Sequence, residues 1–213
     1  MTIYLDNIGK RYRENWVFKG LSYTFEAGKK YALLGQNGSG KSTLLRIVAG
    51  MQHANKGTVR YVSKQCTLPP EKIFQHISYC APAMDLVEEM TLAEFLKFHF
   101  TFKKMLPGVS CSSLIQEMDM EDSGRKMIHE FSSGMKQRVK LAQAFFADTP
   151  VLLLDEPCSN LDTQGIHLYQ RWITQYTHNR TVIIASNDER EYRQQVSASV
   201  FIEDYSGAKP PAF

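Results

Sequence analysis

Apolar residues along the chain follow two patterns, which predict two kinds of strand. Tyr31–Leu34, Val151–Leu154 and Thr181–Ala185 are short, almost continuous apolar runs. Runs of this kind suit parallel strands that are buried on both faces of a sheet. Three other segments are richer in polar residues but contain β-branched and aromatic side chains and end near Gly or Asn. They predict further strands over residues 3–8, 21–25 and 58–62.

Helical patterns alternate with these strands. Residues 164–177 have a helical pattern and precede the strand at 181–185, as the helix of a βαβ unit does. The chain changes character between about residues 84 and 147. Within that region Thr91–Phe100 is helical in pattern and rich in aromatic residues, and few β-branched residues follow until Val139. We interpret residues 84–147 as a mainly helical lobe inserted between strands of the core.

The expected fold is therefore α/β, with a small β lobe at the N-terminus. The chain has 213 residues, of which 43% are hydrophobic, enough for one core and a small attached lobe. We expect residues 1–213 to form a single domain, with a loose tail only at Ser206–Phe213.

The segment Gly35–Ser42 fits the pattern G-x-x-x-x-G-K-[ST] at every fixed position. It lies between the predicted strand at 31–34 and a helical run that begins at Thr43. Glycines allow a turn tight enough to aim several N–H groups at one anion, and the helix N-terminus adds partial positive charge. We predict that Lys41 reaches the β- and γ-phosphates of a nucleotide and that Ser42 ligates Mg²⁺. The predicted binding residues in this segment are Gly35, Gln36, Asn37, Gly38, Ser39, Gly40, Lys41, Ser42 and Thr43.

Two acids follow the apolar run at 151–154. Asp155 is expected to hold Mg²⁺ through water, as the second acid of a P-loop enzyme does. Glu156 is expected to orient and polarise the attacking water, because a carboxylate beside the γ-phosphate is a suitable general base. The chain has no N-K-x-D motif that would read guanine, which favours ATP over GTP.

A further segment, Phe131–Arg138, reads F-S-S-G-M-K-Q-R and resembles the L-S-G-G-Q-x-Q-R signature of ABC-type ATPases. Ser159–Asp162 resembles the D-loop of that family. Tyr12 precedes the phosphate loop by a distance typical of the aromatic residue that stacks on adenine. The resemblance runs from about residue 2 to 203. It implies a P-loop core of the ABC ATPase type that binds ATP and Mg²⁺, with an N-terminal antiparallel β lobe and an inserted helical lobe.

The resemblance also implies partners. Two ATPase domains, identical or different, would form a head-to-tail dimer with each ATP between one phosphate loop and the other signature. Ser132 and the N–H of Gly134 would then donate to the γ-phosphate. The implied function is the ATP-hydrolysing subunit of an ABC transporter, peripheral on the cytoplasmic face of the cell membrane. No apolar run is long enough to span a bilayer, so the membrane-spanning permease is expected to be a separate chain.

The chain departs from the family pattern at several positions. Ser133 stands where glycine is usual, which costs little unless its φ is positive. Pro82 stands near the place of a glutamine that contacts Mg²⁺ or water and links the core to the helical lobe. Asn187 replaces the switch histidine; it can donate an amide hydrogen bond but cannot carry a charge. The signature also departs at Phe131 and Met135. The candidate catalytic residues of the chain are Glu156, Lys41 and Asn187.

Two interpretations of these departures stay open. The chain is either a slow but working ATPase or a non-catalytic, ATP-gated scaffold, and the acids and Lys41 favour the first. A soluble ABC-type ATPase switch that remodels another complex is the alternative from a different class. The formal charge of +3, with Lys and Arg scattered among acids, gives no indication of a nucleic-acid partner. The four cysteines form no C-x-x-C pair, which favours reduced thiols in the cytosol.

Overall fold

A computed structural model of the chain describes residues 1–193 and 195–206, so the tail predicted after Ser206 lies outside the described residues. The N-terminal strands form an antiparallel sheet in the order β2-β1-β4-β5. Tyr12 and Asn15 face each other at the end of the β1–β2 hairpin. The strands of this sheet are β1 (Thr2–Tyr12), β2 (Asn15–Phe25), β4 (Lys56–Ser63) and β5 (Cys66–Leu68).

A second sheet contains the continuous apolar strands. Its order is β6-β7-β8-β3-β9, and all of its pairings are parallel. Every residue of β7 and β8 is buried, as expected for a parallel sheet that is covered on both faces. The strands are β3 (Lys30–Leu34), β6 (Ile77–Cys80), β7 (Val151–Asp155), β8 (Thr181–Ala185) and β9 (Ala198–Phe201).

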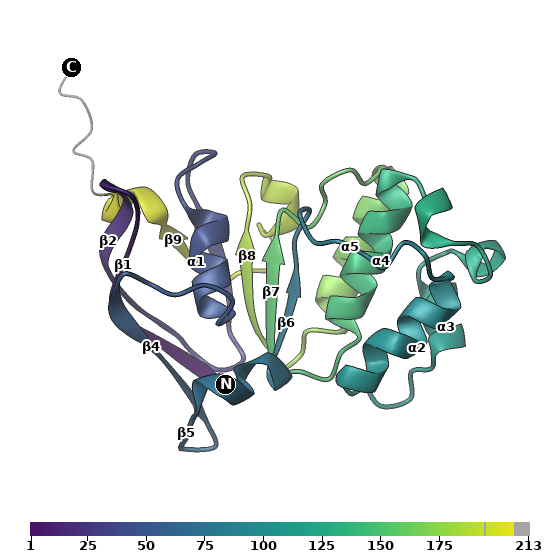
Figure 1. The fold of residues 1–213 in the computed structure, drawn as a ribbon, viewed down its shortest axis with the longest axis horizontal. Coiled ribbons are helices and arrows are strands. Elements are labelled where there is room, and N and C mark those ends of the chain that lie inside the picture. The colour runs from purple at the N-terminus through teal and green to yellow at the C-terminus, as the bar shows by residue number, and fades with distance from the viewer. Residues whose placement is uncertain (194, 207–213) are drawn as a thin grey trace.

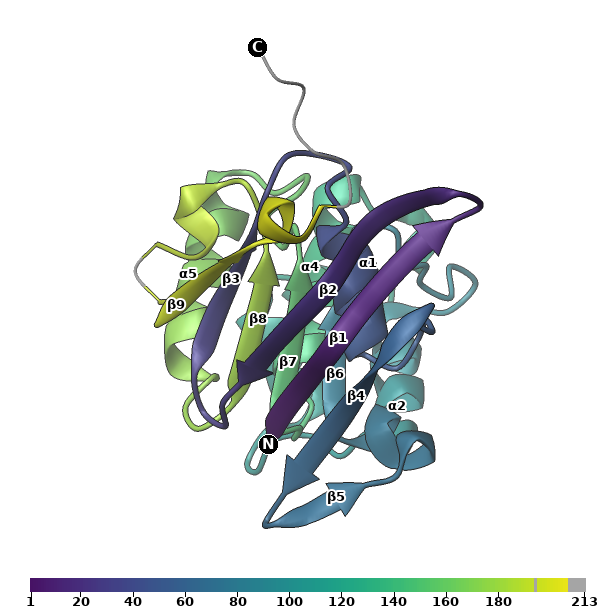
Figure 2. The ribbon, with the colours of Figure 1, turned by 90° about the vertical axis from the view of Figure 1, so that its left-hand side faces the viewer.

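Helices cover both faces of the parallel sheet. In Figure 1 the antiparallel sheet, α1, the strands β8, β7 and β6, and α4 with α5 follow one another from left to right, and α2 and α3 lie beyond. Figure 2 shows β1, β2 and β4 crossing in front of α1 and the parallel strands. The helices are α1 (Lys41–Val48), α2 (Leu92–Phe102), α3 (Cys111–Glu117), α4 (Ser133–Phe145) and α5 (Thr163–Gln175). Short 3₁₀ turns include η1 (Pro70–Gln75), η4 (Glu189–Glu191) and η5 (Ile202–Tyr205).

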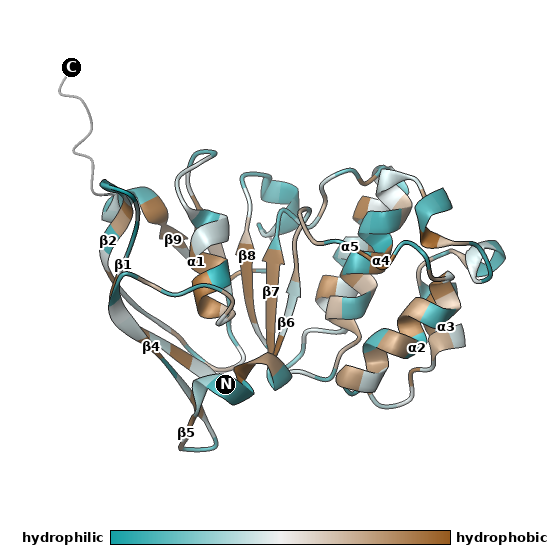
Figure 3. Ribbon diagram, viewed as in Figure 1, coloured by the Kyte–Doolittle hydropathy of each residue, from teal (hydrophilic) through white to brown (hydrophobic). Residues whose placement is uncertain are grey.

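Alternate residues of the central strands enter two separate cores. Leu152 and Leu154 pack with side chains of all four helices α2 to α5. Val151 and Leu153 pack on the opposite face with α1 and the antiparallel sheet. Because α4 shares the first core with the sheet and also contacts β6, it connects the helical region directly to the sheet. Figure 3 shows that β7 and β8 are hydrophobic, whereas η4, which follows β8, is hydrophilic.

The expected α/β architecture is confirmed, with differences at the ends of the elements. β1 extends to Tyr12 and β2 begins at Asn15, well beyond the apolar segments at 3–8 and 21–25, because the two strands pair along a long hairpin. The helical region between β6 and β7 contains α2, α3 and α4. Within the described residues, no helix is long and apolar enough to cross a bilayer, and all four cysteines are unpaired.

Candidate functional site

The phosphate loop connects β3 to α1, as its sequence predicts. Gly40 immediately precedes α1 with φ of 107°, and a Cβ atom there would lie 2.5 Å from Val17 Cγ1. Only glycine satisfies both the positive φ and the close approach of β2. The backbone N–H of Ser39 donates to the Gln36 carbonyl at 3.1 Å, which closes the loop. The loop is therefore folded tightly against the β1–β2 hairpin.

Lys41 folds back over this loop. Its Nζ donates to the carbonyl oxygens of Gly35 at 2.6 Å and Gln36 at 3.2 Å, and the residue is only 5% exposed. Burial lowers the pKa of Lys41, while the carboxylates of Glu156 and Asp155 oppose that shift. A buried cation that donates to carbonyl oxygens is well placed to receive an anionic phosphate.

Ser42 and Asp155 meet at the carboxyl end of β7. Ser42 Oγ donates to Asp155 Oδ1 at 2.9 Å, across 113 residues of sequence. Burial raises the pKa of Asp155, and the hydrogen bond from Ser42 opposes the rise. A hydroxyl and a buried carboxylate are the hard oxygen ligands that Mg²⁺ prefers, so this pair fits the metal. No group of three or more His, Cys, Asp or Glu residues suited to a metal occurs in the described part of the chain.

Glu156 and Asn187 line a cavity of about 260 Å³ beside the phosphate loop, together with Asn37. Asn187 Nδ2 donates to Asn37 Oδ1 at 2.8 Å, so the residue at the switch position touches the loop directly. Glu156 is exposed, and Ser159 Oγ lies 3.4 Å from its Oε2. The structure thus brings the predicted base and the predicted switch residue to one cavity at the same edge of the sheet.

A second cavity, of about 650 Å³, lies between the phosphate loop and the β1–β2 hairpin. Tyr12 lines it and is 50% exposed, and its hydroxyl accepts a hydrogen bond from Gln52 Nε2 at 2.7 Å. Trp16 and Val17 also line the cavity, so the pocket is partly aromatic. This arrangement suits a nucleotide base whose phosphates lie in the adjoining loop.

Glu203 is a residue of this site that the sequence motifs miss. It lies in η5, and its Oε1 accepts the backbone N–H of Gln36 at 2.6 Å. β9 lies parallel to β3, so the segments that leave the two strands meet at one edge of the sheet. The contact of Glu203 with the loop depends on the pairing of β9 with β3, and no local pattern in the sequence predicts that pairing.

The signature segment begins α4. Ser132 is the N-cap, and its Oγ accepts the N–H of Met135 at 3.2 Å. Ser133 does not have a positive φ, so the expectation of a low cost at that position holds. Ser132 is exposed, and a Cβ on Gly134 would lie 3.0 Å from the Asn160 carbonyl. Among the described residues that line the two cavities at the phosphate loop, neither Ser132 nor Gly134 is present.

Pro82 connects the core to the helices through its backbone. Its carbonyl oxygen accepts a hydrogen bond from Lys140 Nζ at 2.6 Å, and Lys140 lies on α4. Gln75 ends η1, before β6, and therefore lies at the opposite end of that strand from Pro82. The contact between the core and the helical region is thus retained without a side-chain amide at position 82.

Residues 18–159 match the family model described as ABC transporter. The chain belongs to this family. A cytochrome c biogenesis ATP-binding export protein, CcmA of Xylella fastidiosa, is 31% identical over 160 residues, covering 75% of this chain and 71% of its own. A Nod factor export ATP-binding protein I of Burkholderia lata is 29% identical over 202 residues, covering 93% of this chain and 66% of its own length.

Solved structures of ABC cassettes share the fold. A putative ABC transporter ATP-binding protein from Pyrococcus furiosus has a TM-score of 0.78 and 21% identity, covering 97% of this chain and 100% of its own. The cassette MJ0796, in a dimeric post-hydrolysis state bound to ADP and Pi, has a TM-score of 0.81 and 21% identity, covering 93% of each chain. At this identity the likeness establishes the ABC ATPase fold of the chain.

Proposed function

We propose that this chain is an ATP-binding and ATP-hydrolysing subunit that drives transport through a separate membrane-spanning partner. The main support for this proposal is the 2.9 Å hydrogen bond between Ser42 and Asp155, which joins the phosphate loop to the acidic end of β7. Lys41 and Glu156 lie beside that contact, as an ATPase of this family requires. ATP is the proposed nucleotide, with Tyr12 beside its base.

Each of these residues has a distinct part in hydrolysis. Lys41 exchanges its carbonyl partners for the β- and γ-phosphate oxygens. Ser42 and Asp155 would hold Mg²⁺, which when bound neutralises charge on those oxygens. Glu156 accepts a hydrogen bond from the attacking water and draws off its proton. Asn187 donates its amide N–H to the γ-phosphate in place of Asn37.

We further propose that the chain acts as one unit over residues 1–213 and closes on a second ATPase domain head to tail. Ser132 and Gly134 lie at an exposed helix N-terminus, which is suited to an anion, and line neither cavity at their own phosphate loop. A γ-phosphate from a second domain would occupy that terminus. The dimeric state of the structurally similar MJ0796 cassette supports this arrangement.

An apolar groove on this chain favours the proposal that it docks a membrane-spanning partner. Such docking would place the chain at the periphery of the membrane, on the cytoplasmic face. The groove lies beside β6, between α2 and η1, with a volume of about 190 Å³ and a lining that includes Met51 and Phe74. These two side chains are 61% and 60% exposed. Exposed apolar side chains grouped in this way favour docking of another protein segment. The names of the relatives, which are export ATP-binding proteins, support a transporter partner.

The substitution Glu156→Gln tests the proposed hydrolysis. The amide keeps the shape of the side chain but cannot accept a proton, so we expect kcat for ATP to fall by about 100-fold or more. ATP affinity should stay within about twofold, since Lys41 and Ser42 are unchanged. Phosphate release and equilibrium ATP binding would be measured on both proteins. Equal turnover in the two would contradict the proposal and favour a non-catalytic, ATP-gated scaffold.

A further inference from the structure

The backbone of Glu156 is strained. Its φ is 43°, in the left-handed region that residues with a side chain rarely adopt. Such a conformation costs on the order of 1–3 kcal/mol and persists only where the surrounding structure holds it. The position of the proposed base therefore depends on the contacts that hold the turn after β7.

Hydrogen bonds of the backbone and of side chains hold this turn. The N–H of Glu156 donates to the Ala185 carbonyl at 2.9 Å, which continues the pairing of β7 with β8. The N–H of Ser159 donates to the Glu156 carbonyl at 3.0 Å, which closes the turn on itself. Two further bonds join the turn to side chains outside it, those of Gln137 and Glu191.

Gln137 holds the turn from the helical side. It lies on α4, one turn after the signature segment begins the helix, and is 2% exposed. Its Nε2 donates to the Pro157 carbonyl at 2.8 Å. Since Gln137 lies on α4 and Ser132 caps the same helix, the turn at Glu156 is joined to the helix that would meet a second domain.

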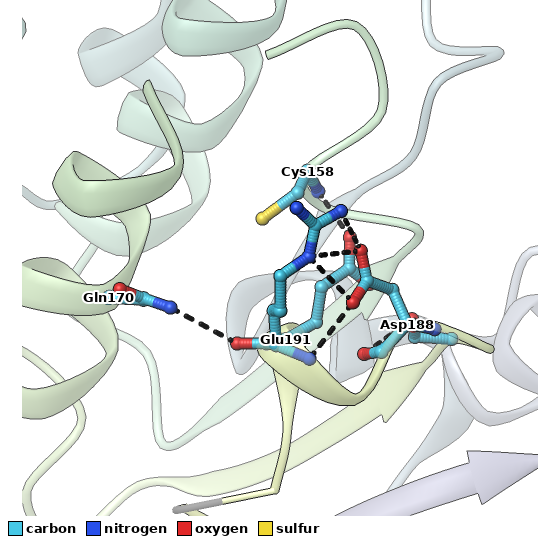
Figure 4. Close-up of polar contacts among 6 residues, drawn as sticks. Cys158, Gln170, Asp188 and Glu191 are labelled. Atoms are coloured by element: carbon cyan, nitrogen blue, oxygen red, sulfur yellow. Dashed lines mark hydrogen bonds and ion pairs between the residues drawn. The ribbon is translucent and has the colours of Figure 1, made fainter. Parts of the chain in front are cut away.

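Glu191 holds the turn from the opposite side. It lies on η4, only 4% exposed, and its Oε1 accepts the backbone N–H of Cys158 at 2.7 Å. Figure 4 shows the carboxylates of Glu191 and Asp188 beside Cys158. Tyr169 from α5 donates its hydroxyl to the Glu191 carbonyl at 2.7 Å, which fixes the position of η4. Glu191 also lines the cavity that contains Glu156 and Asn187.

We propose that Glu191 is a positioning residue for ATP hydrolysis, which holds Glu156 in its strained conformation by accepting the N–H of Cys158. The inference rests on the proposed function, in which Glu156 is the base. η4 begins two residues after Asn187, so the same short segment carries the group that touches the phosphate loop and the group that holds the base. Displacement of η4 would therefore reach the turn at Glu156 through the hydrogen bond to Cys158.

The role requires an acceptor oxygen and not a negative charge. The second carboxylate oxygen of Glu191 is buried and has no close hydrogen-bond partner among the described residues. Burial raises the pKa of Glu191, against the lowering effect of Ser186 and Cys158. Glutamine has the same length and keeps an acceptor oxygen, whereas methionine fills similar space without one. The two substitutions therefore separate hydrogen bonding from packing.

The experiment compares Glu191→Gln and Glu191→Met in steady-state ATPase assays. We expect the Gln variant to keep about half or more of the wild-type kcat, and the Met variant to lose about tenfold, the effect of one lost hydrogen bond. KM for ATP should change less than about twofold in both, because no phosphate contact is removed. Glu189→Gln is the matched control, since Glu189 lies on the same turn but is exposed and pairs with Arg193.

The outcomes separate this inference from the function on which it rests. A Gln variant below about one tenth of wild-type kcat overturns the inference, as does a folded Met variant with wild-type kcat. Thermal unfolding of both variants shows whether each is folded at the assay temperature. If the Met variant is unfolded there, a Gln variant at half wild-type kcat or more still supports the acceptor role. Glu156→Gln is assayed in parallel: if it retains full turnover, the proposed function itself is wrong.

Discussion

At the scale of single residues, the site differs from the usual family pattern most clearly at Asn187. Its side-chain amide donates to Asn37 on the phosphate loop at 2.8 Å, so the position is connected to the loop without a histidine. An amide donates a hydrogen bond but carries no charge. An imidazole also carries a positive charge when the pH is below its pKa of about 6.5. Asparagine at this position therefore keeps a contact with the phosphate loop but supplies no positive charge.

We expect Asn187→His to raise kcat for ATP by about threefold to tenfold, because a charged donor beside the γ-phosphate stabilises developing negative charge. The gain should be larger at pH 6 than at pH 8, since the imidazole loses its proton as the pH rises through about 6.5. Phosphate release measured across this pH range, with Asn187→Ala as the control that removes the donor, tests the prediction. Unchanged turnover in the His variant would mean that asparagine already serves this position fully.

At the scale of elements, the sequence predicts most directly the strands that are buried along their length, and it misses β5. β3, the phosphate loop and β7 have apolar or glycine-rich patterns that follow from their own surroundings, so their positions are close to the expected ones. β5 has two exposed residues and no apolar run, and only its pairing with β4 makes it a strand. Glu203 and Glu191 are distant in sequence from the segments they hold, so neither contact has a local signal.

The placement of β9 beside β3 leads to a prediction about Glu203. Its carboxylate accepts the Gln36 N–H and opposes the lowering of the Lys41 pKa by burial, so it lies close to the proposed phosphate site. Glu203→Gln keeps an acceptor and removes a negative charge, and we expect ATP to bind about twofold to fivefold more tightly at low salt. The gain should shrink in high salt, because Glu203 is exposed to solvent.

Nucleotide titration at two salt concentrations measures this effect. Asp204→Asn removes the same charge from the same turn but leaves the contact with Gln36 intact. It should therefore change ATP affinity less than Glu203→Gln does. Weaker binding by the Gln variant would show that the charge of Glu203 helps to hold the loop and does not oppose the phosphates.

At the scale of the whole molecule, the two hydrophobic cores support different parts of the site. The phosphate loop is supported by the core that contains α1 and the antiparallel sheet, whereas the signature segment is supported by the core that contains α2 to α5. The parallel sheet lies between these cores, with the acids and Asn187 at its carboxyl edge. One molecule therefore presents its phosphate loop and its signature at separated places, which favours completion of each site by a second domain.

This arrangement predicts dimerisation that depends on ATP and on Ser132. In the Glu156→Gln background, ATP with Mg²⁺ should convert the protein from monomer to dimer in solution. Ser132→Asp adds a negative charge where the γ-phosphate of a second domain would bind, yet aspartate is a good N-cap, so α4 should stay folded. We expect this variant to bind ATP normally but to remain monomeric.

Ser110→Asp is the matched control, because Ser110 is also an exposed serine N-cap, at the start of α3. It should dimerise as the parent Glu156→Gln protein does. Light scattering with size exclusion gives the mass of each variant with and without ATP, and equilibrium binding gives its nucleotide affinity. If Ser132→Asp dimerises as readily as Ser110→Asp, Ser132 does not meet the γ-phosphate and the head-to-tail arrangement is wrong. If only Ser110→Asp dimerises while both bind ATP equally, the signature of one domain completes the nucleotide site of the other.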